Sequence, residues 1–449
     1  VEDALKSGRL RCVVATSSLE LGIDMGDVDL VIQVEAPWSV ASGLQRLGRA
    51  GHQVGEVSRG VIFPKHRADV LHSAVVASRM LAGSIEALTP ITNPLDVLAQ
   101  QTIAASALDR WQAEDWFNLV RRSAPFATLS RALLDSVLDL LAGRYPSDEF
   151  AQLRPRIVWD RELDAFTGRP GAQRLAVTSG GTIPDRGTFG VFMLTGTEDL
   201  PDDGTAPRRV VGRRVGELDE EMVYESRVGD VIALGSTSWR IREIGPDQVR
   251  VTPAFGEPGR LPFWIGDALG RPAELGAAMG AFAREYADSE AGNDLDGLLD
   301  PFAAANLRGY LHEMREIAGH IPSDRTLVVE RHRDELGDWR IVLHSPYGRR
   351  VHGPWALMVT ARMREQFGLE ASAIASDDGI IVRLPDIEAE PPGAELFDFA
   401  PDEIEQLVTR EVGGSALFAA RFRENAARAL ILPRSHPGKR SPLWQQRLR

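Results

Sequence analysis

The chain has 449 residues and a formal net charge of −13 at pH 7, with 43% hydrophobic and 26% charged residues. One hydrophobic core stops growing near roughly 250–300 residues, so this length predicts about two to four globular domains. No stretch approaches the ~20 apolar residues of a membrane-spanning helix, and residues 1–30 lack a signal-peptide pattern. These features predict a cytoplasmic protein that has no membrane partner.

The single cysteine, Cys12, excludes an internal disulfide and a multi-cysteine zinc site. It lies in an apolar run, which predicts a small residue of the core. The nine histidines are scattered without zinc-ligand spacing, and Asp377-Asp378 before a glycine is typical of a turn. The sequence therefore predicts no metal site.

The first elements in chain order are those of an α/β domain. Residues 11–16 and 28–34 are apolar, β-branched runs that suit buried parallel strands. A third strand is expected at 59–64 and a helix at 66–83. Residues 1–90 therefore resemble the end of an α/β domain.

The next segment, 91–180, has the order of a winged helix. Asn93-Pro94 suits a helix start, with Asp96 in the first turn. Three helices and then two strands are expected at 93–106, 112–122, 130–142, 154–160 and 173–179. Three helices followed by a hairpin is the winged-helix order.

Residues 181–449 are richer in strands. Short strands with turn signals over about 182–255 predict a β-barrel or sandwich-like unit. A helical stretch at about 272–318 leads to a second set of strands around the helix 354–368. Residues 401–431 are predicted to be helical again. The fold class is multidomain α/β plus α+β.

Charge is segregated along the chain although its total is acidic. Residues 421–449 hold seven Arg and one Lys against one Glu, and residues 207–214 add four Arg with no acid. Attraction to phosphate needs such local clusters. Basic faces can therefore coexist with the acidic total, and a solvated surface is the alternative for each run.

The strongest signal is a pair of motifs, ATSSLELGID at 15–24 and QRLGRAGH at 45–52, with a strand between them. Their order and spacing match motifs V and VI of superfamily 2 helicases. The longer strings TSSLELGIDMGDVDLV and SGLQRLGRAGH resemble the large helicase-related (Lhr) family more closely. TIPDRGTFGVF, STSWRIREI and HSPYGRRVHGPWAL extend that resemblance over nearly the whole chain.

The resemblance implies three domains. These are a partial second RecA-like domain at 1–90, a winged helix at 91–180, and a β-rich, barrel-like core domain with helices at 181–449. It also implies an ATP-dependent 3′-to-5′ translocase and helicase that grips single-stranded DNA. Such an enzyme would unwind DNA or RNA:DNA duplexes in DNA repair, associated with the nucleoid.

ATP and Mg²⁺ are the implied cofactors. The sequence contains no G-x-x-x-x-G-K-[ST] phosphate loop and no D-E-x-H motif. The chain also opens at Val1 without a methionine, and both of its ends are interpreted as cuts. We therefore expect an upstream RecA-like domain of the same protein to be the partner that holds most of the nucleotide.

Motif VI supplies the predicted catalytic residues. Phosphoryl transfer spreads negative charge over the γ-phosphate, and the permanently charged, planar guanidinium of arginine suits that charge. By resemblance, Arg49 is the arginine finger, and Arg46 and Gln45 line the same cleft. His52 stands where the superfamily usually has a second arginine, which leaves a second finger open.

Motif V supplies candidate contacts to nucleic acid and nucleotide. Thr16 and Ser17 carry short hydroxyls that can bond a backbone phosphate without reading sequence. Gly22 would permit close approach of the main chain, and Asp24 would accept from the ATP ribose hydroxyl. Helix capping is the alternative for Thr16 and Ser17.

Aromatic side chains can stack on bases without sequence preference. Trp239, with Arg240 beside it, and Trp264 are the candidates, and a core position in a strand is the alternative for each tryptophan. Ile183 could wedge against a base while Arg186 holds a phosphate. Plain turn chemistry is the alternative there.

Two other classes of protein remain open. One is a non-catalytic nucleic-acid-binding protein in which the motor half is only a scaffold. The other is a nucleobase-processing, glycosylase-like enzyme, which would need a catalytic carboxylate or a water-activating pair in a cleft, and the sequence shows no compelling one. An ATPase assay on a chain extended upstream separates the first from a helicase.

Overall fold

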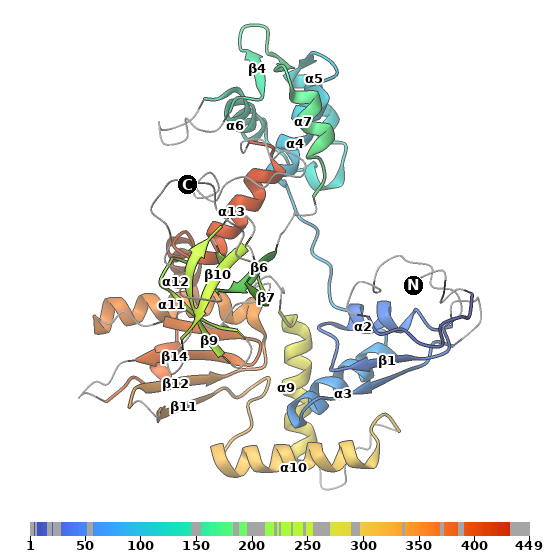
Figure 1. Cartoon of the computed structure of the whole chain (residues 1–449), viewed down its shortest axis with the longest axis vertical. Helices are drawn as coiled ribbons and strands as arrows, with labels where there is room; N and C mark the ends of the chain where they lie inside the picture. Colours follow the sequence, from blue (N-terminus) through green and yellow to red (C-terminus); the bar gives the residue numbers. More distant parts are fainter. Residues whose placement is uncertain are drawn as a thin grey trace. The chain divides into compact units, whose positions relative to one another are not determined.

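The computed structural model describes residues 4, 7–15, 20, 28–51, 57–144, 154–182, 188–194, 212–219, 222–223, 226–234, 237–245, 248–254, 270–288, 297–334, 337–368, 372–384 and 390–431. The chain divides into two compact units, which we call the first and second unit. The first is Val1–Leu88 with Asp267–Gly414, and the second is Thr89–Gly266 with Ser415–Arg449. Each unit therefore combines segments that are distant in the sequence (Figure 1).

The first unit begins with a small α/β region. Strands β1 (Val31–Val34) and β2 (Gly60–Phe63) pair in parallel, with Val31 opposite Gly60 and Val34 opposite Phe63. Helix α2 (Val40–Leu47) follows β1, and α3 (Arg67–Leu81) follows β2. The strands predicted at 28–34 and 59–64 and the helix predicted at 66–83 are confirmed.

The strand predicted at 11–16 is wrong for the residues that the structure describes. Residues 10–15 contain no strand, and Cys12 is exposed instead of buried. A strand needs a neighbour for its backbone hydrogen bonds, whereas the Leu10 amide donates to the Ala4 carbonyl. An apolar run indicates that a segment tends to be buried. It does not show whether another strand lies beside the segment to pair with it.

A shared apolar core joins the α/β region to a much later part of the chain. Helices α9 (Ala273–Asp288) and α10 (Pro301–Ala318) confirm the helical stretch predicted at 272–318. They pack on α3 through a set of buried side chains from both segments, namely Val70, Val75, Val76, Leu275, Met279, Ala283, Leu307 and Leu311. The three helices therefore belong to one folded body.

Two glycines of α9 let the main chain of other segments approach closely. A Cβ added at Gly276 would lie 2.2 Å from the Pro346 carbonyl oxygen, and one at Gly280 would lie 2.3 Å from the Asp324 nitrogen. Both positions face backbone, which cannot swing away as a side chain can. The spacing of four residues puts both glycines on one face of the helix.

A four-stranded antiparallel sheet completes most of the first unit. Its strands are β11 (Val328–Arg333), β12 (Trp339–His344), β13 (Ser372–Ser376) and β14 (Gly379–Leu384), in the order β11-β12-β14-β13. Alternate residues such as Ile341 and Leu343 are buried, because one face packs on α11 (Arg349–Phe367).

The turn and the helix next to this sheet differ in how closely they follow the predicted elements. Asp377 and Asp378 form the turn between β13 and β14, as predicted. Strand β13 was not predicted. Helix α11 begins at Arg349, ahead of the predicted start, and keeps Pro354 inside it, although proline is more typical of a helix's first turn. The turn η4 (Ala394–Phe397) and helix α12 (Pro401–Val412) end this unit.

The second unit contains the winged helix. Its helices and strands are α4 (Leu95–Ser106), β3 (Trp111–Gln112), α5 (Ala113–Val120), η2 (Ala124–Phe126), α6 (Arg131–Ala142), β4 (Ile157–Asp160), β5 (Ala165–Gly168) and α7 (Ala172–Thr178). The strands form a sheet in the order β3-β5-β4. The buried indole of Trp116 donates to the Thr102 hydroxyl at 3.0 Å inside the core.

The strand predicted at 173–179 is wrong, because these residues form helix α7. Gly171, at φ +90°, turns the chain directly before the helix, a conformation that glycine adopts readily. Ala172 and Leu175 are buried three residues apart, which is helical spacing. The wing hairpin is instead β4 with β5, and the winged-helix order is confirmed.

A separate five-stranded sheet follows in the second unit. It contains β6 (Thr188–Met193), β7 (Arg213–Asp219), β8 (Val231–Leu234), β9 (Thr237–Ile244) and β10 (Gln248–Pro253), in the order β7-β6-β10-β9-β8. The prediction of a β-barrel is wrong for the described strands, because no hydrogen-bonded pair joins the edge strands β7 and β8 and the sheet stays open. The side chain of Leu234 in β8 does approach the backbone of β7, since a Cβ on Gly216 would lie 2.7 Å from it.

The last described helix, α13 (Ala416–Arg428), returns to the winged helix. Ala426, Ala429 and Leu430 join its core. The Arg156 guanidinium donates to the Leu430 carbonyl at 2.7 Å. The segments of 181–431 are thus divided between the two units, and the domain limits predicted at 90 and 180 stay predictions. No helix within the described ranges has the length and apolar character needed to cross a bilayer.

The α9 glycines generate a prediction about stability. Gly280→Ala should destabilise the chain by about 1–3 kcal/mol, because the added methyl group overlaps the Asp324 backbone. Gly413→Ala is the control, since a Cβ there meets no atom within 4 Å, and its effect should stay within about 1 kcal/mol. Urea denaturation measures both, and equal effects would contradict the close approach.

Candidate nucleotide and nucleic-acid site

Helix α2 and the turn after it carry the three predicted catalytic residues. Gln45 and Arg46 lie near the end of α2, and Arg49 follows Gly48 directly after it. Gly43 brings α2 against α3, because a Cβ there would lie 2.7 Å from the Met80 sulfur. We call residues 40–49 the arginine helix.

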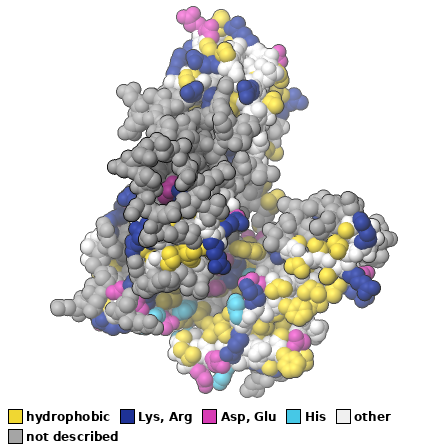
Figure 2. Space-filling model, viewed as in Figure 1, with side chains coloured by type: hydrophobic (Ala, Val, Ile, Leu, Met, Phe, Trp, Pro, Cys, Tyr) yellow, Lys and Arg dark blue, Asp and Glu magenta, His cyan; other side chains and the backbone are white. Residues whose placement is uncertain are grey.

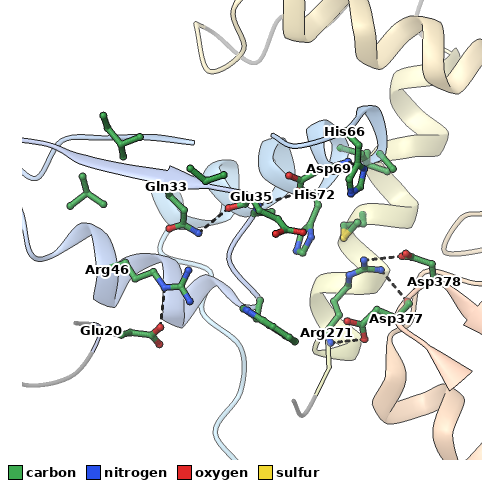
Figure 3. A pocket seen from close by; sticks show the side chains of 18 of the residues that line it. Glu20, Gln33, Glu35, Arg46, His66, Asp69, His72, Arg271, Asp377 and Asp378 are labelled. Carbon is green, nitrogen blue, oxygen red and sulfur yellow. Dashed lines mark hydrogen bonds and ion pairs between the residues drawn. The ribbon is translucent and has the colours of Figure 1, made fainter. Parts of the chain in front are cut away.

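The two arginines of this helix make different contacts. Arg46 Nε donates to the Glu20 carboxylate at 2.9 Å, and both side chains are mostly buried (Figure 3). Arg49 Nε donates to the Gln45 carbonyl at 3.4 Å. Glu20 belongs to motif V, so one ion pair links the two motifs. Sequence reasoning missed Glu20, although it lies inside ATSSLELGID.

The arginine helix borders a large hollow of the first unit. The hollow has a volume of about 1750 Å³, and Glu20, Arg46 and Arg49 are among its lining residues. Ile32 and Val34 of β1 also line it and are 61% and 67% exposed. Figure 2 shows hydrophobic side chains on this part of the surface. The hollow therefore has an apolar side, formed in part by exposed side chains of β1.

The far side of the same hollow is polar and tightly bonded. Arg271, which is buried, donates to the Asp378 carboxylate at 2.9 Å and to the Asp377 carbonyl (Figure 3). The Asp377 carboxylate accepts from the backbone amides of Arg271 and Arg349, both at 2.8 Å. These bonds fix the β13–β14 turn to the start of α9 and of α11.

His72 of α3 lies beside Arg271 in this polar region (Figure 3). Burial, and then the positive charge of Arg271, lower the pKa of His72 to about 4, against the opposing effect of Asp69. The folded chain therefore holds His72 neutral at pH 7. Burial likewise lowers the pKa of His352, which contacts the Ser376 carbonyl and the Ser345 hydroxyl.

Trp239 lies in β9 of the second unit. Its indole N–H donates to the Leu234 carbonyl at 3.1 Å, and its ring packs at the margin of the sheet's apolar core. It alternates with Arg240 along the strand, on the side of buried Ile241. The position agrees with both the stacking role and the core role, so the stacking role stays a prediction.

Arginines gather on the opposite face of β9 and β10. Arg240 donates to the Gly229 carbonyl, Arg242 to the Thr252 hydroxyl, and Arg250 to the Glu243 carboxylate. We call Arg240, Arg242 and Arg250 the arginine face. Sequence reasoning named only Arg240. The alternation of Arg and Ile in RIREI could have identified Arg242.

Eight of the residues weighed from the sequence lie outside the described residues. They are Thr16, Ser17, Gly22, Asp24, His52, Ile183, Arg186 and Trp264. Their predicted roles stay predictions. Among the described residues, no group of three or more His, Cys, Asp or Glu side chains could hold a metal ion.

The chemistry available at the arginine helix follows from its charges. Two guanidiniums one helical turn apart, beside a hollow, can bind and neutralise a polyphosphate. The donor set therefore fits a nucleoside triphosphate. Among the described residues of this region no nucleophile is hydrogen-bonded to a base, so positioning and charge stabilisation are what the site can supply.

The neutral state of His72 generates a prediction about pH. The unfolded chain protonates its histidines below about pH 6.5, whereas the folded chain resists protonation of His72 down to about pH 4. Stability should therefore fall as the pH drops from 6.5 toward 4, by on the order of 3 kcal/mol from this residue.

The variant His72→Asn should flatten that part of the stability profile between pH 4.5 and 7. His312→Asn is the control, because His312 is exposed. Denaturant melts at each pH measure both variants. A wild-type slope retained in His72→Asn would show that His72 titrates normally.

Three family profiles match the chain. "Helicase conserved C-terminal domain" covers residues 1–53, which hold both motifs. "Large helicase-related protein, winged helix domain" covers residues 78–261. "DEAD/H associated" covers residues 321–449.

Curated relatives extend over the whole chain. The Lhr helicase/probable uracil glycosylase of Mycolicibacterium smegmatis is 64% identical over 100% of this chain and 29% of its own length. The Lhr helicase/uracil glycosylase of Escherichia coli is 58% identical over the same shares. The ATP-dependent helicase Lhr-Core of Methanothermobacter thermautotrophicus is 31% identical over 100% of this chain and 51% of its own length.

One solved structure has the same fold. The structure of Mycobacterium smegmatis helicase Lhr bound to ssDNA and AMP-PNP has a TM-score of 0.78 and 56% identity, over 99% of this chain and 51% of that chain. The chain thus spans between 29% and about half of the length of these relatives. Motifs, profiles and relatives agree that this chain is a region of a protein of the Lhr family of helicases.

Proposed function

We propose that the chain is part of an ATP-dependent 3′-to-5′ translocase and helicase that grips single-stranded DNA. The observation that carries this proposal is the arginine helix, which presents Arg46 and Arg49 at a hollow large enough for another domain's surface. Support comes from relatives named ATP-dependent helicases and from a relative solved with ssDNA and AMP-PNP.

In this proposal Arg49 acts as the arginine finger. A guanidinium stabilises charge that develops in the transition state more than charge in the ground state, so it raises kcat. Arg46 would contact the same phosphates after exchanging its Glu20 partner, and exposed Gln45 would line the cleft. ATP supplies the phosphoryl group whose transfer drives strand movement.

The upstream RecA-like domain is the proposed partner that holds most of the ATP and the Mg²⁺. No described residue of this chain is assigned to Mg²⁺. In motif V, Thr16 and Ser17 are proposed to bond a strand phosphate, while Gly22 and Asp24 approach the nucleotide. These roles rest on the resemblance in sequence.

The grip on DNA is proposed to come from the second unit. The arginine face carries Arg240 and Arg242 two residues apart on β9, and Arg250, which pairs with Glu243, on the neighbouring β10; such a cluster can attract the phosphates of a strand. Trp239 would stack on a base, with Ile183, Arg186 and Trp264 as further contacts. RNA:DNA duplex unwinding, a role in DNA repair and association with the nucleoid belong to the same proposal.

The ATPase reaction tests the role of Arg49. In a helicase that contains this chain and the preceding RecA-like domain, Arg49→Ala should lower kcat for ATP by about 10³-fold or more. Arg49→Lys should recover only part of the rate, because lysine keeps the charge and loses the fork. Arg67→Ala is the control, since Arg67 pairs with Glu313 on α10.

Four outcomes separate the candidate functions. Loss of turnover in Arg49→Ala alone supports the helicase. No turnover in the unaltered protein favours a non-catalytic binding protein. Turnover undiminished in Arg49→Ala would overturn the proposed function, and base release from uracil-containing DNA by this region would favour a glycosylase-like enzyme.

The stacking role of Trp239 can be tested by measuring how ATP hydrolysis is coupled to DNA unwinding. Trp239→Ala should lower the number of base pairs unwound per ATP by about tenfold, because one base-stacking contact contributes ~1–3 kcal/mol. Trp239→Phe should retain most of the coupling. Strand-displacement and ATPase assays on the same preparation measure the ratio. A large fall in melting temperature for Trp239→Ala, with coupling intact, would assign the ring to the core.

A further inference from the structure

The start of the arginine helix is held by a residue from a distant part of the chain. The Glu86 carboxylate accepts from the backbone amide of Val40 at 2.6 Å and from that of Ala41 at 3.2 Å. The next two amides bond to Ser39, that of Ser42 to its hydroxyl and that of Gly43 to its carbonyl. The Gly43 bond is the first bond inside the helix itself. Three of the four N–H groups that a helix start leaves without a helical partner, those of Val40, Ala41 and Ser42, are therefore satisfied by the two side chains.

Glu86 also supplies a charge that the helix itself lacks. Its first turn contains no acidic residue, whereas a helix start is stabilised by negative charge. The first turns of α3 and α5, by comparison, carry Asp69 and Glu114. The capping charge of the arginine helix thus comes from outside it.

Glu86 lies in the connector that leads from the first unit to the winged helix. This connector runs from Ala82, after α3, to Pro94, before α4. Ile85 and Leu88 on either side of Glu86 are 54% and 90% exposed. The half-buried carboxylate of Glu86 anchors this exposed stretch to the arginine helix.

We propose that Glu86 is a positioning residue that sets the placement of Arg46 and Arg49, and thereby links the connector to ATP turnover. The inference rests on the proposed function. A pull on the connector would act on the first turn of an eight-residue helix. The arginine finger follows the last turn of that helix, so a shift of its start moves the guanidinium. Small misplacements of a catalytic group cost rate steeply.

Glu86→Ala should lower kcat for ATP by about tenfold with KM little changed, because the arginine acts on the transition state. Glu86→Gln, which keeps one accepting oxygen, should give a smaller loss. The protein is the helicase that contains this chain and its preceding RecA-like domain.

Asp300→Ala is the matched control. Asp300 caps α10 in the same way, since its carboxylate accepts from the amides of Phe302 and Ala303. Helix α10 carries no proposed catalytic residue. Both variants should lower the melting temperature to a similar extent, and only Glu86→Ala should lower kcat.

A double variant tests whether Glu86 acts through Arg49. In the Arg49→Ala background, Glu86→Ala should cause no further loss of ATPase rate, because residues that act as a unit are not additive. An equal loss in both backgrounds, or a kcat loss matched by Asp300→Ala, would overturn the positioning role. Undiminished turnover in Arg49→Ala would instead count against the proposed function itself.

Discussion

The packing of α3 against α9 and α10 is the constraint on which the first unit depends. Val70, Val75 and Val76 of α3 are buried against Leu275, Met279 and Leu307 of the later helices, in addition to Val40 of α2. The close approaches at Gly276 and Gly280 then bring the β11–β14 region against α9. The α/β fragment and the later sheet are therefore one body, so whatever shifts the arginine helix acts on a rigid base.

Within the first unit, charged groups on the polar side of the hollow are balanced by hydrogen bonds and an ion pair. Arg271 is buried with its charge balanced by Asp378, and the Asp377 carboxylate serves two backbone amides. Loss of Asp378 should cost stability, because the buried guanidinium of Arg271 would lose its carboxylate partner, whereas the Asp378 carboxylate is itself exposed to water. His72 stays neutral beside it, which avoids a second buried cation.

The sequence predicted those parts of the fold that local pattern determines. Strands β1 and β2, helix α3 and the winged-helix order follow from apolar spacing and from turn residues. The failures share a cause outside the local pattern. Residues 173–179 form a helix because Gly171 reverses the chain just before them, and residues 11–15 lack a strand because no described neighbour pairs with them.

The candidate site was predictable only in part for the same reason. Arg46 and Arg49 are visible in a motif whose chemistry requires arginine. Glu20 and Glu86 act on that motif from 26 and 46 residues away, counted from Arg46 to Glu20 and from Val40 to Glu86. Nothing in the spacing of carboxylates along a chain identifies which of them will meet a helix start, because that meeting is decided by tertiary structure.

The interleaving of the two units constrains how this chain can be shortened or synthesised. The chain passes between the units after Leu88, after Gly266 and after Gly414. The core of the first unit cannot form until α9 and α10 have left the ribosome. Strands β1 and β2 are therefore synthesised before the winged helix but can pack fully only after it has been made. A product ending anywhere before residue 267 would hold an exposed α3 face, a target for chaperones and proteases.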